Sequence, residues 1–380
     1  MSSVVKITIS SDVVKDGLDP TKVFAFPLDD FQKQAITALN QGRSVVVTAP
    51  TGSGKTVVGE YAIYRAISHK QKVFYTTPLK ALSNQKLRDF RKQFGQQSVG
   101  LMTGDLSVNR EASIIVMTTE IFRNMLYAKC DGDDDPLLEV ETVVLDECHY
   151  MNDSQRGTVW EESIIHCPSS VQIVALSATV ANAGQLTDWI QRVHGPTDLV
   201  CSVFRPVPLR YSFCSAKGLH PLLNKDGNGL HPNCKIWRAP KGHKRKGSSS
   251  KPLQPEPPKI KFVISQMFAR NMLPAIYFIF SRRGCDKAVK DLLPFCLVSA
   301  NEQRLIRKRL LKYTELNPEA VRNDLHANAL LQGIAAHHAG VLPAWKELIE
   351  SLFQDGLVKV VFATETLAAG INMPARSTVI

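Results

Sequence analysis

The sequence lacks the features of secreted, membrane-spanning and metal-stapled proteins. Its first residues, MSSVVKITISSDVVKDG, have neither the basic start nor the apolar run of a secretory signal. No apolar stretch approaches the roughly 20 residues that a membrane helix needs. The eight cysteines form no Cys-x-x-Cys pair, and none has a histidine at zinc-like spacing. We therefore expect reduced thiols, no membrane partner and a soluble, cytoplasmic protein.

Most of the chain also lacks an excess of positive over negative charge. The formal net charge is +11, but residues 217–261 hold eleven Lys or Arg and two acids, and so contribute +9 of it. The charge therefore gives little support for a basic groove along the whole chain, although this one segment could touch phosphates. A solvated linker explains the segment at least as well.

The composition and the hydrophobic pattern indicate a folded α/β protein. The chain has 380 residues, of which 44% are hydrophobic and 21% charged, as in soluble proteins of two or three domains. Short Val- and Ile-rich runs alternate with amphipathic stretches, which is typical of buried parallel strands and crossover helices. Strands are predicted at residues 44–48, 72–76, 113–117, 142–145, 172–176, 274–280 and 358–363, and helices at 302–313 and 318–331.

A stretch rich in Gly, Pro, Ser and Lys divides this pattern into two parts. We expect an N-terminal extension at residues 1–24 and a first α/β domain at 25–200. A linker or insertion at 201–260 would lead to a second α/β domain at 261–380.

The segment VVVTAPTGSGKT predicts a phosphate-binding loop between a strand and a helix. Gly52 and Gly54 would let backbone N–H groups surround phosphate oxygens, and the helix N-terminus adds a positive dipole end. Lys55 would reach the β- and γ-phosphates, and Thr56 would hold Mg²⁺. A structural glycine turn is the weaker alternative. The predicted ATP-binding residues here are Pro50, Thr51, Gly52, Ser53, Gly54, Lys55 and Thr56.

A second apolar strand, TVVL, ends in two adjacent carboxylates. Asp146 and Glu147 would emerge at the same sheet edge as the phosphate loop. Asp146 would then hold Mg²⁺ through water, and Glu147 would orient or deprotonate the attacking water, as phosphoryl transfer requires. Alone, such a pair would more often be a helix cap or a solvated turn.

Asp-Glu-Cys-His is a DExH box, and the segments around it resemble the superfamily 2 helicase motifs in their usual order. These segments are FQKQAI, TTPLKAL, TGD, TTEIFRNM, SAT, FIFSRR, AAHHAG and ATETLAAGINMPA. A narrower resemblance, to the superkiller-type or antiviral-helicase branch, rests on DECHYMNDSQRGTVWEE, FRPVPL and HHAGVLPAWKELIE. It implies two tandem RecA-like parallel-sheet domains that unwind RNA in the 3′-to-5′ direction with ATP and Mg²⁺.

The resemblance also implies roles for individual residues. Gln32 would read the adenine base with Phe24 or Phe26 stacked on it, and Gly370 would help to complete the ATP site. The residues expected to act in hydrolysis are Lys55, Asp146, Glu147, His149, Ser177 and Thr179. Those expected to contact nucleic acid are Thr77, Pro78, Lys80, Thr118, Arg123, Ser281, Arg282, Thr364 and Thr366. Taken singly, each could be an ordinary surface residue, and His149, His337 and His338 could be structural.

The sequence departs from the family pattern at its end. It stops at Ile380, before the Gln-x-x-Gly-Arg-x-Gly-Arg segment, so the resemblance implies a second domain that is incomplete at its C-terminus. No arginine finger can be assigned. Three readings remain: an RNA helicase core, a repair-type DNA helicase, and an ATP- and RNA-binding module without turnover. A P-loop kinase or transporter ATPase is disfavoured because neither needs the later motifs. The sequence does not identify the protein partners.

Overall fold

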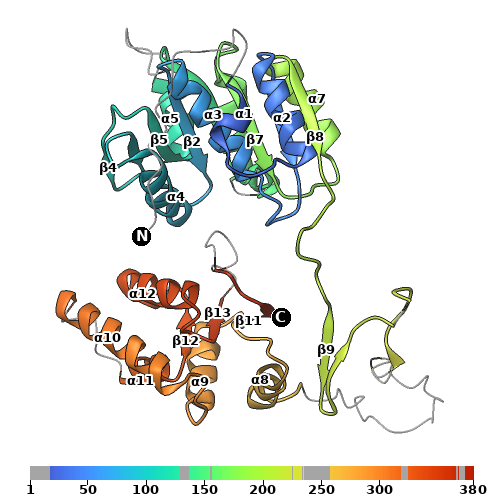
Figure 1. Ribbon diagram of the computed structural model, residues 1–380, viewed down its shortest axis with the longest axis vertical. Helices are drawn as coiled ribbons and strands as arrows, with labels where there is room; N and C mark the ends of the chain where they lie inside the picture. Colours follow the sequence, from blue (N-terminus) through green and yellow to red (C-terminus); the bar gives the residue numbers. More distant parts are fainter. Residues whose placement is uncertain are drawn as a thin grey trace, which may run out of the picture. The chain divides into compact units, whose positions relative to one another are not determined.

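The chain forms two compact units, which we describe separately. The computed structural model describes residues 18–128, 137–154, 156–224, 226–232, 234, 257–317, 324–364, 367 and 373–380. Unit 1 comprises Met1–Pro208 and unit 2 comprises Leu209–Ile380, and Figure 1 shows the elements of each. The division between them falls within the predicted linker, 201–260.

Unit 1 is built on an eight-stranded sheet of order β4-β3-β5-β2-β6-β7-β1-β8. All neighbours are parallel except β3 and β4. The strands are β1 (Ser44–Thr48), β2 (Lys72–Thr77), β3 (Val99–Met102), β4 (Ser107–Val108), β5 (Ile114–Thr118), β6 (Val140–Leu145), β7 (Gln172–Ser177) and β8 (Thr197–Cys201).

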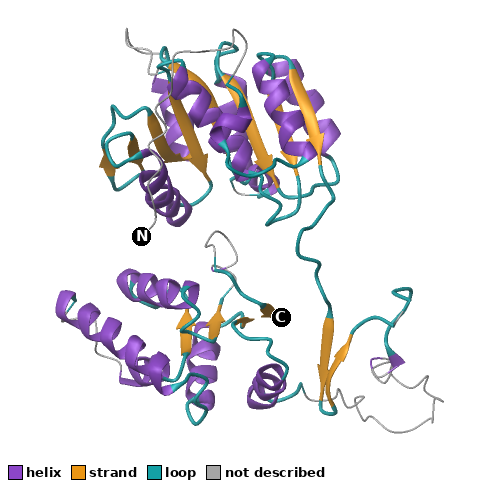
Figure 2. Ribbon diagram, viewed as in Figure 1, coloured by secondary structure: helices purple, strands orange, loops and turns teal. Residues whose placement is uncertain are grey.

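Helices cover both faces of this sheet (Figure 2). One face packs against α1 (Pro20–Val23), α2 (Asp30–Asn40), α3 (Thr56–Ser68) and α4 (Lys80–Phe94), and the other against α5 (Thr119–Ala128), α6 (Gly157–His166) and α7 (Ala183–Val193). The short 3-10 helix η2 (Cys148–Asn152) follows β6. Val45 and Val47 belong to the first core and Val46 to the second, so β1 is buried on both faces. This explains its unbroken SVVVT sequence.

Unit 2 contains a smaller parallel sheet of order β12-β13-β11-β14. Its strands are β11 (Ala275–Phe278), β12 (Ile334–His337), β13 (Val360–Ala363) and β14 (Ser377–Val379). One face packs against α8 (Ile260–Ala269) and α9 (Arg282–Leu292), and the other against α10 (Ala300–Leu316), α11 (Asp324–Leu331) and α12 (Pro343–Gln354). The α/β class, with two parallel-sheet units in tandem, is therefore confirmed.

Part of the predicted linker is folded. An antiparallel hairpin, β9 (Ser212–Ser215) and β10 (Gly218–Pro221), lies within residues 201–260, and β10 contacts α8. Cys214 packs against the core on this side of unit 2. Most of the remaining basic segment lies outside the described residues. Among the helices that are described, none is long and apolar enough to cross a membrane.

Candidate functional site

The phosphate loop joins β1 to α3 as the sequence predicts. Gly52 and Gly54 have φ angles of +83° and +86°, a region that favours glycine. The Lys55 ammonium donates to the carbonyl oxygens of Ala49, at 2.8 Å, and Pro50, at 3.3 Å. Burial lowers the pKa of Lys55, whereas Glu147 and Asp146 act in the opposite direction. The loop therefore holds a desolvated cation beside the two carboxylates.

Gln32 braces this loop from α2. Its Nε2 donates to Gly54 O at 3.0 Å, while its Oε1 accepts the Asp29 amide at 2.8 Å. Of the two phenylalanines expected near the base, Phe24 is buried and Phe26 is 51% exposed. Phe26 is thus the ring available for stacking, and the adenine-reading role of Gln32 stays a prediction.

The carboxylate of Asp146 is fixed from two sides at the end of β6. Its Oδ2 accepts a hydrogen bond from the Tyr75 hydroxyl at 2.7 Å. Its Oδ1 accepts the Glu147 amide at 3.0 Å. The ammonium of Lys86, on α4, lies 3.5 Å from Oδ2. Neither Tyr75 nor Lys86 was identified from the sequence.

The position of the Lys86 ammonium shows that the residues predicted to hold Mg²⁺ can surround a cation. Lys86 Nζ lies 3.4 Å from Thr56 Oγ1 and 3.5 Å from Asp146 Oδ2. A hydroxyl and a carboxylate oxygen therefore surround one point that already accommodates a cation. Oxygen donors of this kind are the ligands that Mg²⁺ prefers. Thr56 and Asp146 accordingly fit the role predicted for them.

Glu147 combines an unusual backbone angle with a partly buried carboxyl group. Its φ of +52° is unusual for a residue with a side chain, and it turns the chain from β6 into η2. Burial, followed by the nearby Asp146, raises the pKa of Glu147, and Lys55 opposes this. A carboxylate with a raised pKa accepts a proton more readily near neutral pH.

His149 links the acidic pair to the SAT segment. Its Nδ1 accepts the Ala178 amide at 3.4 Å and lies 3.3 Å from Glu147 Oε2. Burial, and then Lys55, lower the pKa of His149, which favours the neutral ring over the imidazolium. Ser177 O accepts the Ala49 amide at 3.2 Å. Thr179 is exposed.

The predicted nucleic-acid residues of unit 1 gather where β2 and β5 end (Figure 1). Thr77 and Thr118 are paired in register and buried. The Thr77 hydroxyl contacts Ser83 Oγ at 2.8 Å. Pro78 offers a carbonyl, which accepts from Arg156 at 3.0 Å. These residues are brought together, but the Thr77 hydroxyl and the Pro78 carbonyl already have partners within the fold.

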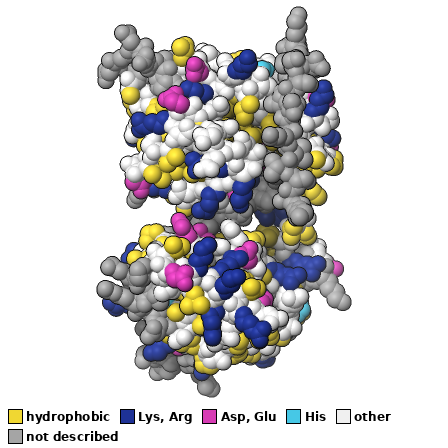
Figure 3. All heavy atoms as spheres, turned by 60° about the vertical axis from the view of Figure 1, so that its left-hand side comes forward, with side chains coloured by type: hydrophobic (Ala, Val, Ile, Leu, Met, Phe, Trp, Pro, Cys, Tyr) yellow, Lys and Arg dark blue, Asp and Glu magenta, His cyan; other side chains and the backbone are white. Residues whose placement is uncertain are grey.

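The charged members of this set are more exposed. Lys80 lies 2.7 Å from Asp105, with 56% and 70% of the two side chains exposed. Arg123 lies 3.4 Å from Glu162. On the face shown in Figure 3, Lys and Arg side chains occur on both units, interspersed with Asp and Glu. On this face, the charged side chains therefore do not mark a path for RNA.

In unit 2 the predicted residues lie at the ends of β11 and β13. Ser281 caps α9, its hydroxyl accepting the Gly284 amide at 3.2 Å, and Arg282 follows it on the exposed surface. The Thr364 amide donates to His337 O at 3.4 Å. Thr366 and Gly370 lie outside the described residues.

The paired histidines have structural partners. His337 Nε2 lies 2.9 Å from Glu350. His338 Nε2 lies 3.0 Å from Asp286, and its Nδ1 accepts the Gly340 amide at 3.1 Å. Both rings are 4% exposed. They hold unit 2 together at the strand ends.

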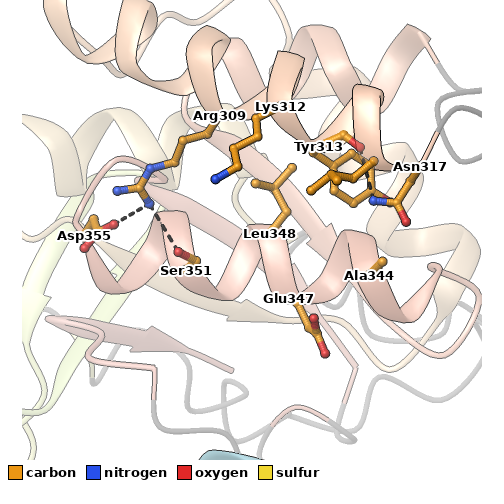
Figure 4. Close-up of a pocket in the computed structure, with 10 residues that line it drawn as sticks. Arg309, Lys312, Tyr313, Asn317, Ala344, Glu347, Leu348, Ser351 and Asp355 are labelled. Carbon is orange, nitrogen blue, oxygen red and sulfur yellow. Dashed lines mark hydrogen bonds and ion pairs between the residues drawn. The ribbon is translucent and has the colours of Figure 1, made fainter. Parts of the chain in front are cut away.

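A separate groove of about 500 Å³ lies between α10 and α12 (Figure 4). Arg309 crosses it to Ser351, at 3.2 Å, and forms an ion pair with Asp355. None of the predicted site residues lines this groove. The groove is therefore not part of the candidate site, which lies at the ends of the strands.

The DEAD/DEAH box helicase family matches residues 29–186, which contain the phosphate loop, the acidic pair and the SAT segment. These residues form a DEAD/DEAH box helicase domain.

Two curated proteins show the branch of helicases that this chain resembles. It is 46% identical over 398 residues to the chloroplastic DExH-box ATP-dependent RNA helicase DExH15 of Arabidopsis thaliana, covering 94% of this chain and 34% of that protein. It is 42% identical over 381 residues to superkiller complex protein 2 of Mus musculus, covering 95% of this chain and 30% of that protein. The chain thus spans about a third of the length of these relatives.

A solved helicase shares the fold. It is the Mycobacterium smegmatis helicase Lhr bound to ssDNA and AMP-PNP, with a TM-score of 0.57 and 22% identity over 93% of this chain and 42% of that one. At this identity the likeness concerns the fold alone.

Proposed function

We propose that this chain is the ATP-hydrolysing core of an ATP-dependent RNA helicase, with RecA-like domains at residues 25–200 and 261–380. The observation that carries the proposal is the meeting of Lys55, Asp146 and Glu147 at one sheet edge, where each carboxylate shifts the pKa of Lys55. The SAT segment joins the same edge through the Ala49 amide and Ser177 carbonyl. The name of the Arabidopsis thaliana relative, an ATP-dependent RNA helicase, supports RNA as the substrate.

The hydrolysis step can be assigned to residues of unit 1. Lys55 and the amides of the loop would bind the phosphates, and Thr56 and Asp146 would hold Mg²⁺, which supplies charge neutralisation at the phosphate oxygens. Glu147 would orient the attacking water and accept its proton. His149 and Ser177 would hold the SAT segment beside the acidic pair and the phosphate loop. Thr179 would help to couple ATP hydrolysis to movement of the nucleic-acid strand.

RNA binding would use backbone and side-chain contacts to phosphates from both units. Lys80, Arg123 and Arg282 supply positive charge at the strand ends, and Ser281 and Thr364 supply hydroxyls. Thr77, Pro78, Thr118 and Thr366 complete the proposed path. The ion pair between Lys80 and Asp105 would open when a phosphate replaces the Asp105 carboxylate, because both side chains are more than half exposed.

We further propose unwinding in the 3′-to-5′ direction, which follows from the superkiller-type motifs. A DNA substrate is the second candidate, since none of the residues proposed to contact the strand distinguishes ribose from deoxyribose. The same experiment also tests the opposite direction of unwinding, which would require a 5′ overhang.

The test is strand displacement from duplexes with one 3′ or one 5′ overhang, made in RNA and in DNA, with Mg²⁺ and ATP. The proposal expects displacement of the RNA duplex with the 3′ overhang, and none by the Lys55→Ala variant. Displacement that prefers the 5′ overhang contradicts the direction. A preference for the DNA duplex contradicts the substrate.

A further inference from the structure

Lys86 places a positive charge between the two residues that fit Mg²⁺. Its ammonium lies 3.4 Å from Thr56 Oγ1 and 3.5 Å from Asp146 Oδ2, and 16% of its side chain is exposed. It comes from the second turn of α4, the helix that begins at Lys80. No motif of the sequence drew attention to it.

We propose that Lys86 is a positioning residue that stands in for the divalent cation when no nucleotide is bound, and gives up this place when the cation arrives. The inference rests on the proposed function, because it takes Thr56 and Asp146 as the metal ligands. The Lys86 ammonium thereby occupies the point between the Thr56 hydroxyl and the Asp146 carboxylate, while Tyr75 holds that carboxylate in place.

The contacts of Lys86 are those of an exchangeable charge. A well-formed hydrogen bond between an ammonium and a carboxylate has a length of about 2.7–2.9 Å, whereas Lys86 stands 3.5 Å from Asp146. Tyr75 already anchors the same carboxylate oxygen at 2.7 Å. Lys86 is therefore not needed to fix Asp146, and its departure leaves that hydrogen bond in place.

The surroundings let the ammonium stay close without a strong bond. Lys86 Nζ lies 5.1 Å from the centre of the Tyr75 ring and 5.7 Å from that of Phe90, and cations are attracted to such faces. The positive charge of Lys86 also acts to lower the pKa values of Glu60 and Glu147. A lysine has a flexible four-carbon stem, so the charge can move aside while the stem remains packed.

A dication at this point and the Lys86 ammonium would repel each other. The energy of two like charges falls with distance and with the local dielectric constant, so a half-buried cation a few ångström away weakens metal binding. Removal of the ammonium should therefore tighten binding of a divalent ion to the nucleotide-free protein. A lysine that merely stabilises the fold would have no such effect.

The experiment uses Mn²⁺ as the probe, counted as free ion by electron paramagnetic resonance, with the full chain and no nucleotide. Lys86→Met is compared with wild type and with Lys92→Met, an exposed lysine near the end of the same helix. We expect Mn²⁺ to bind about tenfold tighter to Lys86→Met than to the other two proteins. The double variant Lys86→Met/Asp146→Asn should lose this gain.

A second measurement guards against a folding defect. In chelator, the melting temperature of Lys86→Met should lie below that of Lys92→Met, and Mn²⁺ should raise it more than it raises that of wild type. Equal Mn²⁺ affinities of Lys86→Met and wild type, including undetectable binding by both, would overturn the inference.

Binding of a fluorescent ATP analogue to the same proteins separates the two claims. If the analogue binds in a Lys55-dependent way and the Mn²⁺ affinity is unmoved, only the role of Lys86 is wrong. If the analogue does not bind at all, the proposed function fails, and the inference fails with it.

Discussion

The Gln32 side chain donates from Nε2 to the carbonyl oxygen of Gly54 at 3.0 Å and so ties α2 to the phosphate loop. A Cβ added at Gly54 would lie 2.8 Å from this Nε2, closer than such contacts allow, and the φ of +86° is itself unfavourable for alanine. We expect Gly54→Ala to displace Gln32, reshape the loop and weaken ATP binding by at least about tenfold. Titration with a fluorescent ATP analogue measures this.

Gly52→Ala is the matched control. Gly52 lies in the same loop and has a similar φ of +83°, but nothing lies within 4 Å of its added Cβ. Both variants bear the backbone strain within the phosphate loop, so their difference reports the contact with Gln32. Equal ATP affinities for the two variants would contradict this account of the loop.

Glu147→Gln should raise thermal stability at neutral pH while it abolishes turnover. Folding raises the pKa of Glu147 above its ordinary 4.5 through burial and the nearby Asp146. The folded state then binds more protons than the unfolded state. The stabilisation is therefore complete below pH 4.5 and is lost as the pH rises through the higher folded value.

The measurement is the melting temperature of Glu147→Gln and wild type between pH 4 and pH 8. The advantage of the variant should grow as the pH rises. Glu161→Gln, an exposed glutamate on α6, serves as the control. A pH-independent difference, or a variant that melts lower than wild type at pH 7, would show that the desolvated charge is not the cause.

The contiguous parts of the fold and site could be predicted from the sequence. Buried Val and Ile runs marked β1, β2, β5, β6, β7, β11 and β13, because strands covered on both faces need no polar positions. The strands β3, β4, β8, β9, β10, β12 and β14 were missed. In β8, at a sheet edge, only Thr197 and Val200 are buried, and the short IAAH of β12 lacks bulky β-branched residues apart from Ile334.

The site divides in the same way. The phosphate loop and the acidic pair carry their chemistry in adjacent residues, so spacing alone revealed them. Lys86 and Tyr75 are distant from Asp146 in sequence and meet it only because β2 pairs with β6 and α4 packs against β2. One signal was available: Ser83 and Phe90 are buried, and Lys86 lies three and four residues from them on the same helical face. A lysine on a buried helical face predicts a negatively charged or polar partner, because an unpaired buried charge is unfavourable.

Arg65 is expected to be a structural cation of unit 1. Its guanidinium donates to Glu141, at 2.6 Å, and to Leu39 O and Gln172, and 8% of its side chain is exposed. Arg65→Met would leave Glu141 buried without this partner, at a cost of about 3–5 kcal/mol in the free energy of unfolding.

Arg43→Met is the comparison, because the ion pair of Arg43 with Asp198 is over a third exposed on both sides. We expect a loss below about 1 kcal/mol there. Urea unfolding followed by circular dichroism compares the two variants. Similar losses for both would contradict the assignment of Arg65.

Lys80→Ala tests the proposed path of the RNA. If Lys80 meets a phosphate, its removal should weaken binding of single-stranded RNA and reduce the slope of log K against log [salt] by about 0.7. Fluorescence anisotropy at several salt concentrations gives the slope, with Lys92→Ala as the control from the same helix. An unchanged slope for Lys80→Ala would exclude Lys80 as a phosphate contact.

The most direct test of the central claim is ATP turnover by this chain with and without single-stranded RNA, beside Lys55→Ala and a single-stranded DNA competitor. The account predicts turnover that rises with RNA, disappears in Lys55→Ala and resists competition by DNA. Turnover that ignores RNA would contradict an RNA helicase core. Absent turnover in a folded chain that still binds ATP and RNA would also contradict the account, in favour of a binding module that does not hydrolyse ATP.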